Sequence, residues 1–464
     1  MIFITVDRSS SISLTQQIYE QIRTSILGNT LKEGQKLLST RELSATIGVS
    51  RNIAMEAYDR LIAEGFLEVK PKAGTYVSKG TTLSTIKHME HEKSRTDFFQ
   101  TEKSYIDFRG GNPATDYFPR KKWGQLTKEV CMDSPKHIFG YSDPRGVQEL
   151  RNVLAQYLHK ARGVKCDPDQ IIITSGATQA LRLITELLLN PEGFIASEDP
   201  VADEMRNIFA MANAKVYPVP VDENGIIPEQ LPEDAPNFLF VIPSHQFPLG
   251  GILSIQRRLM LIEYARKSGC YIVEDDYDSE FTYEGAPVPS MQGIDQQHVL
   301  YVGTFSKILS PALRIGYVVL PRNLLHEFQQ LKWFNDRHTS SIEQYVLARF
   351  MEEGHFDRHI RKMKKIYQER RQVLVDVIKH YFPDAKIIGK AAGMHLVVEF
   401  PGVHFTEDIM QRMKREGVCI YPVEQYSMQK GKHKHLAVLG YGGVAPKEIT
   451  RGISILKRVL EREI

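Results

Sequence analysis

The fold is decided by the stretch Tyr301-Val-Gly-Thr-Phe-Ser-Lys307-Ile-Leu-Ser-Pro-Ala-Leu-Arg314-Ile-Gly-Tyr317, which predicts a strand, a turn of small residues and a second strand. A lysine held between buried strands loses part of its hydration, and this favours its neutral, nucleophilic amine. Thr304 and Arg314 flank Lys307 with a hydroxyl and a guanidinium, which suit the phosphate of a phosphorylated aldehyde. For this window alone, a surface lysine near a buried, paired arginine is an equally good explanation.

A second strand with polar residues at its end lies upstream. It is Tyr271-Ile-Val-Glu-Asp275-Asp276-Tyr277-Asp278. In open sheets of alternating strands and helices, ligands bind beyond the carboxyl ends of the strands. A carboxylate at Asp275 could keep a pyridine nitrogen protonated, which makes the ring an electron sink. The phenol of Tyr277 could hydrogen-bond a hydroxyl on the same ring.

A third strand ends in a turn that can bind phosphate. The stretch Ile171-Ile-Ile-Thr-Ser175-Gly176-Ala177-Thr178-Gln179-Ala180-Leu181 predicts a buried strand, a small-residue turn at Gly176 and Ala177, and the start of a helix. The free N–H groups and the positive dipole end of such a helix start attract phosphate. The three strand ends therefore predict one phosphate-containing ligand site.

Three strand-end sites in this order resemble the fold-type I aminotransferases, which bind pyridoxal 5′-phosphate (PLP). The resemblance implies an α/β fold, a mostly parallel doubly wound sheet with a smaller α+β C-terminal subdomain. On that match Lys307 is similar to the lysine that forms the internal aldimine, Asp275 to the pyridinium partner and Tyr277 to the 3-hydroxyl partner. The residues that resemble the phosphate-binding set are Gly176, Ala177, Thr304 and Arg314.

The motif Gly140-Tyr141-Ser-Asp-Pro144-Arg145-Gly146 precedes a predicted helix over 147–161. In the same resemblance, Tyr141 is similar to the tyrosine that reaches the phosphate of the neighbouring subunit's cofactor. The resemblance therefore implies a homodimer whose sites are completed across the interface. A turn aromatic without a ligand role is the alternative for Tyr141.

Composition predicts a soluble globular protein of two or three domains. The chain has 464 residues, 42% of them hydrophobic and 25% charged, and a net charge of +3. This charge is too small to predict nucleic-acid binding, so a DNA-binding face would depend on where charges lie. The four cysteines are scattered without a C-x-x-C pair, which argues against a metal site and fits a reducing cytoplasm. We expect no membrane partner, because neither a signal pattern nor a membrane-spanning apolar run is present.

The N-terminal part of the chain predicts three helices and a hairpin. Apolar residues recur at helical spacing over 14–27, and two further helices are expected over 41–47 and 51–64. Gly48-Val49-Ser50 forms a tight turn between the second and third helices. Alternating strands around Pro71-Lys-Ala-Gly74 complete a winged helix-turn-helix, whose third helix would enter the major groove of double-stranded DNA.

Polar and basic side chains gather at the N-termini of the second and third helices and on the wing. Phosphate contacts are expected at helix N-termini, and the wing would lie on the backbone or in the minor groove. The alternative is a small helical domain for protein contacts, whose arginines are merely solvated. The residues that we expect on DNA are Ser39, Thr40, Arg41, Ser50, Arg51, Asn52, Lys72 and Gly74.

Leu37-Leu-Ser-Thr-Arg-Glu-Leu43, Gly48-Val-Ser-Arg-Asn52 and Gly74-Thr-Tyr-Val77 resemble the winged-helix domains of the GntR family. Leu38 departs from that pattern, since the family usually has proline there. The departure concerns the rigidity of a loop, not the fold.

A second resemblance covers nearly the whole chain. A winged helix, a linker and an aminotransferase-like domain, in this order, resemble the MocR subfamily of GntR regulators. Ser244-His-Gln-Phe-Pro248 and Glu274-Asp-Asp-Tyr-Asp-Ser-Glu-Phe281 are especially similar to that subfamily. The boundaries that we predict are 1–78 for the winged helix, 79–104 for a flexible linker, and 105–464 for the PLP-binding domain, with a small subdomain over roughly 322–464.

Two positions depart from the broader aminotransferase pattern. Ala202 stands where an aromatic side chain commonly stacks on the cofactor ring, and His245 is a candidate to cover the ring or an ordinary structural histidine. Val438 stands where these folds often carry the arginine that binds a substrate α-carboxylate. A carboxylate there would lack its bidentate partner. The effector is therefore not a simple α-amino acid, or another arginine such as Arg206 binds its carboxylate.

The resemblance implies a PLP-dependent transcriptional regulator. An amino-compound effector, or PLP itself, would change DNA binding by a homodimer that is implied to be domain-swapped. A working aminotransferase with an appended winged helix for partner docking is the first alternative, and a structural PLP-binding module is the second. The effector, the target and the direction of regulation are beyond the sequence.

Overall fold

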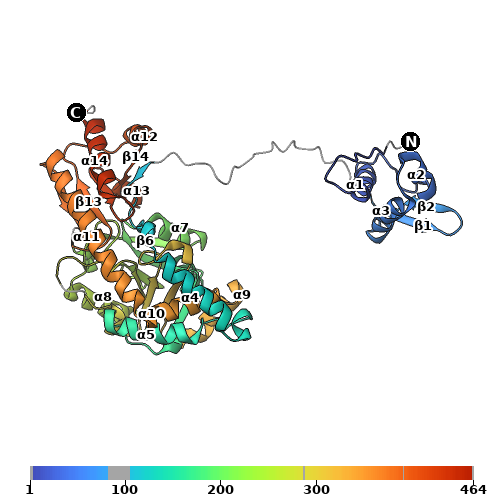
Figure 1. Ribbon diagram of the computed structural model, residues 1–464. Helices are drawn as coiled ribbons and strands as arrows, with labels where there is room; N and C mark the ends of the chain where they lie inside the picture. Colours follow the sequence, from blue (N-terminus) through green and yellow to red (C-terminus); the bar gives the residue numbers. More distant parts are fainter. Residues whose placement is uncertain (1–3, 82–104, 286–287, 390, 462–464) are drawn as a thin grey trace. The chain divides into compact units, whose positions relative to one another are not determined.

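The computed structural model describes residues 4–81, 105–285, 288–389 and 391–461. It divides into two compact units, Met1–Thr101 and Glu102–Ile464, which we describe separately (Figure 1). From residue 82 onward the predicted linker over 79–104 lies outside the described residues, so its flexibility stays a prediction.

The smaller unit is a winged helix-turn-helix, which confirms the prediction. The Ser39 hydroxyl accepts a hydrogen bond from the Glu42 amide, and the Glu42 carboxylate accepts one from the Ser39 amide. Ser50 caps the next helix by accepting from the Ile53 amide, and Gly48 ends the preceding helix with a φ of 69°. The elements are α1 (Leu14–Leu27), α2 (Thr40–Ile47), α3 (Arg51–Ala63), β1 (Leu67–Lys70) and β2 (Gly74–Val77).

One apolar stripe from each helix forms the core of this unit. Ile18, Ile22 and Ile26 of α1 are fully buried in one cluster with Ala54 and Leu61 of α3. This packing fixes the helices and leaves the polar N-termini of α2 and α3 at the surface.

An eight-stranded sheet forms the centre of the larger unit. β11 is antiparallel to both neighbours and β7 is antiparallel to β6, whereas the other pairs are parallel, so the prediction of a mostly parallel sheet is confirmed. In spatial order the strands are β4 (Ile171–Thr174), β11 (Gly316–Val319), β10 (Val299–Thr304), β9 (Tyr271–Asp276), β8 (Phe238–Val241), β5 (Phe194–Asp199), β6 (Lys215–Asp222) and β7 (Gly225–Ile226).

Helices cover both faces of this sheet, because alternate strand residues point to opposite faces. Ile171 and Ile173 pack with one set of helices, and Ile172 packs with the other. The first set is α4 (Arg120–Asp133), α5 (Gln148–Arg162), α8 (Ile255–Ser268) and α10 (Ser341–Glu352). The second set is α6 (Ala177–Leu188), α7 (Asp203–Met211) and α9 (Leu325–Asp336).

A four-stranded antiparallel sheet forms the smaller half of this unit (Figure 1). Its strands, in spatial order, are β12 (Lys386–Ile388), β13 (His395–Glu399), β16 (Leu436–Gly440) and β15 (Tyr421–Pro422). The helices of this half are α11 (His355–Tyr381), α12 (Glu407–Arg415), α13 (Val423–Tyr426) and α14 (Pro446–Leu460). α9 and α10, inside the predicted 322–464 subdomain, pack on helices of the eight-stranded half instead.

The segment 418–422 is divided between two sheets. β14 (Val418–Cys419) pairs in parallel with β3 (Ile106–Asp107), and β15 pairs with β16. The cause is β3, a distant partner that pairs with the first half of the segment, so the chain changes sheet at the buried Ile420.

Candidate functional site

The carboxyl ends of β4, β9 and β10 share one edge of the large sheet, because these strands run in the same direction. Lys307 follows β10, Asp275 lies near the end of β9, and β4 leads through Gly176 into α6. The structure thus brings together the three predicted segments, at the edge where such sheets bind ligands.

Lys307 is only partly exposed. Burial lowers the pKa of its ammonium, and the nearby carboxylate of Glu204 opposes this effect. Gly111, from a loop far away in the sequence, has a φ of 76°, and a Cβ on it would lie 3.2 Å from the Lys307 Nζ. The glycine therefore leaves room beside the amine, whose ammonium form burial makes less favourable.

The Asp275 carboxylate is buried and incompletely paired. Asp275 is 4% exposed, and its Oδ1 has no hydrogen-bond partner among the described residues. Burial first, and then the Asp276 carboxylate, raises the pKa of Asp275 to about 7. An unpartnered buried acceptor is costly, so this oxygen is suited to a donor such as a protonated ring nitrogen.

Tyr277 and His245 belong to one buried network. The Tyr277 hydroxyl donates to the His245 carbonyl oxygen at 3.0 Å, and the His245 Nδ1 lies 3.1 Å from an Asp278 carboxylate oxygen. The His245 ring is fully buried and lies 4.6 Å from the His395 ring, centroid to centroid. The pKa of His395 falls to about 3, chiefly through burial, so that ring is neutral. His245 therefore holds the Tyr277 side chain in place.

The turn after β4 and the Arg314 side chain face each other. Gly176 has a φ of 102°, and a Cβ there would lie 3.1 Å from the Arg314 guanidinium. Arg314 itself has a φ of 50° and donates to the Ser175 carbonyl at 2.5 Å. Gly316 allows β11 to pass this turn, since a Cβ on it would lie 2.7 Å from the Gly176 backbone. Gly176, the Ala177 amide at the start of α6 and the Arg314 guanidinium are together suited to bind an anion, and we call this set the anion cradle.

Thr304 lies at the end of β10, and its hydroxyl is linked to a residue that our sequence analysis did not select. The Thr304 hydroxyl donates to the Ser306 hydroxyl at 3.0 Å and accepts from the Ser306 amide at 3.1 Å. The alternation of small hydroxyl residues before Lys307 was a usable signal for Ser306. No sequence signal pointed to Gly111, on a distant loop, or to Glu204, in the first turn of α7.

The three positions singled out for ring and effector contacts have different environments. The Arg206 guanidinium pairs with Asp203 and donates to the carbonyl oxygens of Gln425 and Ser427, so it fastens α7 to that segment. Ala202 precedes α7 as its N-cap residue. Val438 is fully buried in β16. The effector role of Arg206 remains a prediction.

Tyr141 lies in an aromatic surface patch. Its side chain is 78% exposed, and the Arg337 guanidinium lies 4.5 Å from the ring centroid. His338 meets the same ring edge-on, and the exposed Trp333 and Phe334 lie in the same segment at the end of α9. Exposed patches of this kind mark association surfaces.

The eight residues expected on DNA lie at the positions that the sequence predicts, namely the starts of α2 and α3 and the hairpin turn. All are exposed except Thr40, which is half-buried. Lys72 adopts a φ of 60° in the turn. Lys36, which sequence analysis missed, pairs with Tyr76 of the wing and places its ammonium 6.0 Å from that ring. The wing therefore gains another cation.

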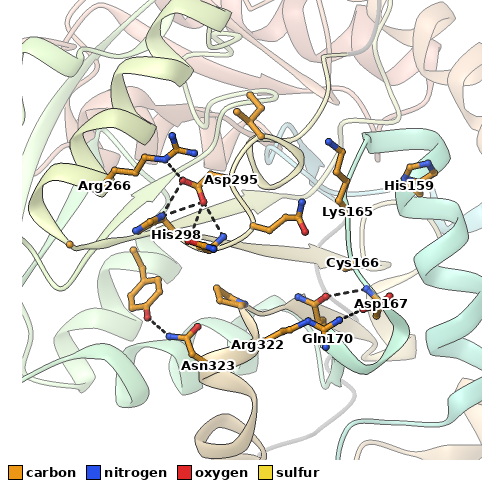
Figure 2. Close-up of a pocket in the computed structure, with 16 residues that line it drawn as sticks. His159, Lys165, Cys166, Asp167, Gln170, Arg266, Asp295, His298, Arg322 and Asn323 are labelled. Carbon is orange, nitrogen blue, oxygen red and sulfur yellow. Dashed lines mark hydrogen bonds and ion pairs between the residues drawn. The ribbon is translucent and has the colours of Figure 1, made fainter.

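A cavity of about 1310 Å³ lies elsewhere in the larger unit (Figure 2). Its lining includes residues that precede or begin strands, such as Gln170, Tyr271 and His298, so it marks the opposite edge of the sheet. Its charged groups largely pair with one another: Asp295 binds both Arg266 and His298. This cavity contains none of the predicted cofactor residues.

Two further observations concern the described residues only. They contain no cluster of three or more histidine, cysteine or acidic side chains that could hold a metal ion. Their helices are all too short or too polar to span a membrane.

Comparison with known families accounts for both units. The aminotransferase class I and II model matches residues 103–434, and the model of bacterial regulatory proteins of the gntR family matches residues 14–77. Among solved structures, an archaeal alanine:glyoxylate aminotransferase is 26% identical, with a TM-score of 0.73 over 78% of this chain and 91% of that one. The kynurenine aminotransferase of Pyrococcus horikoshii is 27% identical, with a TM-score of 0.72 over 78% and 92%.

Relatives with both units match almost end to end. The uncharacterized HTH-type transcriptional regulator YdeL of Bacillus subtilis is 33% identical over 97% of this chain and 98% of its own. The probable rhizopine catabolism regulatory protein MocR of Rhizobium meliloti is also 33% identical, over 98% and 95%. The pyridoxine biosynthesis transcriptional regulator PdxR of Corynebacterium glutamicum is 31% identical over 83% of each chain. The chain therefore belongs to the MocR-like transcriptional regulators of the GntR family, in which a winged helix precedes an aminotransferase class I and II domain.

Proposed function

We propose that this protein is a cytoplasmic transcriptional regulator that binds PLP at Lys307 and changes its grip on DNA when an amino compound binds. The observation that carries the proposal is the buried, unpartnered Oδ1 of Asp275 beside a partly desolvated lysine, in a chain that also has a winged helix. The domain limits that we propose are 1–78, 79–104 and 105–464.

The residues present fit PLP at each of its polar groups. Asp275 offers an unpaired acceptor for the pyridinium nitrogen, and Tyr277 offers a phenol for the 3-hydroxyl. The anion cradle of Gly176, Ala177 and Arg314, extended by the Thr304 hydroxyl, would hold the phosphate. When bound, PLP supplies an aldehyde carbon to which either Lys307 or an effector amine can bond.

The protein groups have separate tasks in this scheme. Burial lowers the pKa of Lys307, and this raises the share of the neutral amine, which is the form that bonds to an aldehyde. Asp275 stabilises positive charge on the ring nitrogen, and its own pKa falls once that charge is present. His245 and Asp278 fix the Tyr277 phenol, so the hydrogen bond to the ring is preorganised.

On the DNA side, we propose that the starts of α2 and α3 bind phosphates and base edges in the major groove. Arg41, Arg51 and Asn52 are exposed there, on helices whose caps are already satisfied by Ser39 and Ser50. These caps stabilise the helix starts, whose positive dipole ends attract the phosphates of DNA. Lys72 and Gly74 of the wing would contact the backbone or the minor groove.

We also propose a homodimer, domain-swapped as in the resemblance, with Tyr141 completing the partner's phosphate site. The exposed patch of Tyr141, Trp333 and Phe334 supports an association surface on the larger unit. Gln179 of α6 donates to Asn335 and Asp336 beside that patch, which links it to the helix start of the anion cradle.

Aminotransferase turnover is the second candidate, because the lysine and the ring-nitrogen carboxylate are both present and the solved relatives include aminotransferases. The buried Val438, in place of a carboxylate-binding arginine, argues against efficient turnover of ordinary α-amino acids.

The test uses full-length protein loaded with PLP. We expect a visible absorbance band that disappears in Lys307→Ala, and salt-sensitive, sequence-preferring mobility shifts on the upstream region of the protein's own operon. An amine that shifts the band should also change the DNA affinity. Many turnovers per site, with release of an oxo product and no DNA response, would instead support the aminotransferase.

A further inference from the structure

A second cation, Arg109, lies near Lys307 of the proposed PLP site. Arg109 precedes the Gly110-Gly111 pair, and a Cβ on Gly111 would lie 3.2 Å from the Lys307 Nζ. The Arg109 charge is close enough to help lower the pKa of Lys307. Arg109 therefore lies within electrostatic reach of the amine, although it is separated from it by 198 positions in the sequence.

Arg109 is held close to Val438, which stands where related folds often carry an arginine. Tyr421 of β15 is directly opposite Val438 of β16, so both side chains project from the same face of the small sheet. The Arg109 Nε donates to the Tyr421 hydroxyl at 3.2 Å, and its guanidinium lies 5.2 Å from the Tyr421 ring centroid. The Val438 side chain packs beside Gly110, where a Cβ would lie 3.3 Å from it. An arginine carried by a loop thus stands next to a position where a strand arginine is absent.

The guanidinium keeps donors available for a ligand. Only its Nε forms a side-chain hydrogen bond in the described part of the chain, and no ion pair there involves it. The Tyr421 hydroxyl donates in turn to Asp107, which fixes the tyrosine that holds the arginine. Arg206 differs, because its Nη atoms already bind Asp203 and two carbonyl oxygens. A planar guanidinium with free Nη groups suits a carboxylate.

We propose that Arg109 binds the carboxylate of the effector, so the effector is an amine that also carries a carboxylate. This inference rests on the proposed function, since the effector's amine is taken to bind where Lys307 holds the cofactor. Tyr421 is a positioning residue, which holds the guanidinium without touching the ligand. The carboxylate of Glu204, whose charge also acts on Lys307, would disfavour ligands with further negative charge.

The experiment titrates full-length, PLP-loaded protein with α-, β- and ω-amino carboxylates and with the matched amino carboxamides. Apparent dissociation constants come from the shift of the visible band. Independently, they come from the amine concentration at the midpoint of the change in the fraction of DNA bound in a mobility-shift assay. At least one carboxylate should bind about 10- to 100-fold more tightly than its amide, and Arg109→Gln should reduce that ratio to about 1. Arg109→Lys should keep part of the ratio, and Tyr421→Phe should lower it severalfold.

Arg206→Gln is the matched control and should retain the ratio. The inference is overturned if Arg109→Gln keeps the selectivity while its Lys307-dependent band is normal, or if Arg206→Gln alone abolishes it. In both cases the proposed function stands. Absence of any Lys307-dependent band in the unmodified protein would overturn the proposed function and this inference together.

Discussion

The winged helix and the strand-end site place their charged groups in opposite surroundings. At the starts of α2 and α3, Arg41 and Arg51 are exposed to solvent on helices that local caps already complete. At the carboxyl ends of β9 and β10, Asp275 is buried with an unpaired oxygen, and Lys307 is partly desolvated by burial. The first surface suits a large anion that arrives with its own counterions. The second suits a small molecule whose every polar group must be matched.

The largest expected effect comes from Lys307→Ala, which should remove PLP binding and leave DNA binding intact. Lys307→Ala should abolish the PLP absorbance band, because Lys307 is the lysine whose charge acts on Asp275, whereas DNA affinity without effector should change less than about twofold. Visible spectra and mobility shifts on the same preparation test this. Lys165→Ala, at the opposite edge of the sheet, is the control and should leave both unchanged. A persistent band in Lys307→Ala would refute the assignment.

Arg51→Ala tests the winged helix, because it should change DNA binding and leave PLP binding intact. Arg51→Ala should weaken specific DNA binding about 10-fold or more and lower the salt dependence by roughly one phosphate contact, with an unchanged PLP band. Arg60→Ala changes the other end of α3, where the arginine pairs with Glu56, and should alter DNA binding little. Equal losses in both variants would indicate damage to the helix instead of a DNA contact.

Asp275→Asn tests the cost of the buried carboxylate. Its pKa of about 7 exceeds the ordinary 3.8, so the folded state retains a proton that the unfolded state releases. The carboxylate therefore destabilises the fold increasingly as pH rises from 3.8 to about 7. Cofactor-free Asp275→Asn should be more stable to urea at pH 8, by of the order of 2 kcal/mol, and the gain should vanish toward pH 4. The same variant should bind PLP more weakly. A gain that does not depend on pH would contradict this cause.

The smallest effect concerns the start of α2. Ser39→Ala removes the hydroxyl that accepts from the Glu42 amide and should destabilise the winged helix by about 1 kcal/mol, without changing the PLP band. Thermal unfolding followed by circular dichroism measures the loss. Ser44→Ala, inside the same helix, is the control. An equal loss there would assign the effect to helix propensity.

The winged helix was predictable almost to the residue because its signals are local. Ser39, Ser50 and Gly48 each act on neighbours within one turn, so capping, spacing and turn geometry specify the same boundaries. Lys307 and Asp275 could be placed at the carboxyl edge of the sheet for a similar reason, since each lies near the end of an apolar strand, and their cofactor roles stay predictions.

The parts that escaped prediction depend on contacts between distant segments. Gly111 and Glu204 reach the lysine only after the large sheet has assembled, and neither belongs to a periodic pattern. The division of 418–421 into two strands follows from β3, a partner more than 300 positions earlier. Local sequence rules carry no information about such pairings.

The strand β3 lies shortly before the proposed carboxylate-binding residue, Arg109, in the larger unit. It is the first described strand of that unit, it is held by hydrogen bonds from the Ile106 and Phe108 amides to the β14 segment, and Arg109 follows directly. The backbone that enters the unit from the N-terminal side is therefore the backbone that carries the proposed carboxylate receptor. We therefore expect a ligand bound at Arg109 to act first on β3 and on its pairing with β14, without first rearranging the eight-stranded core.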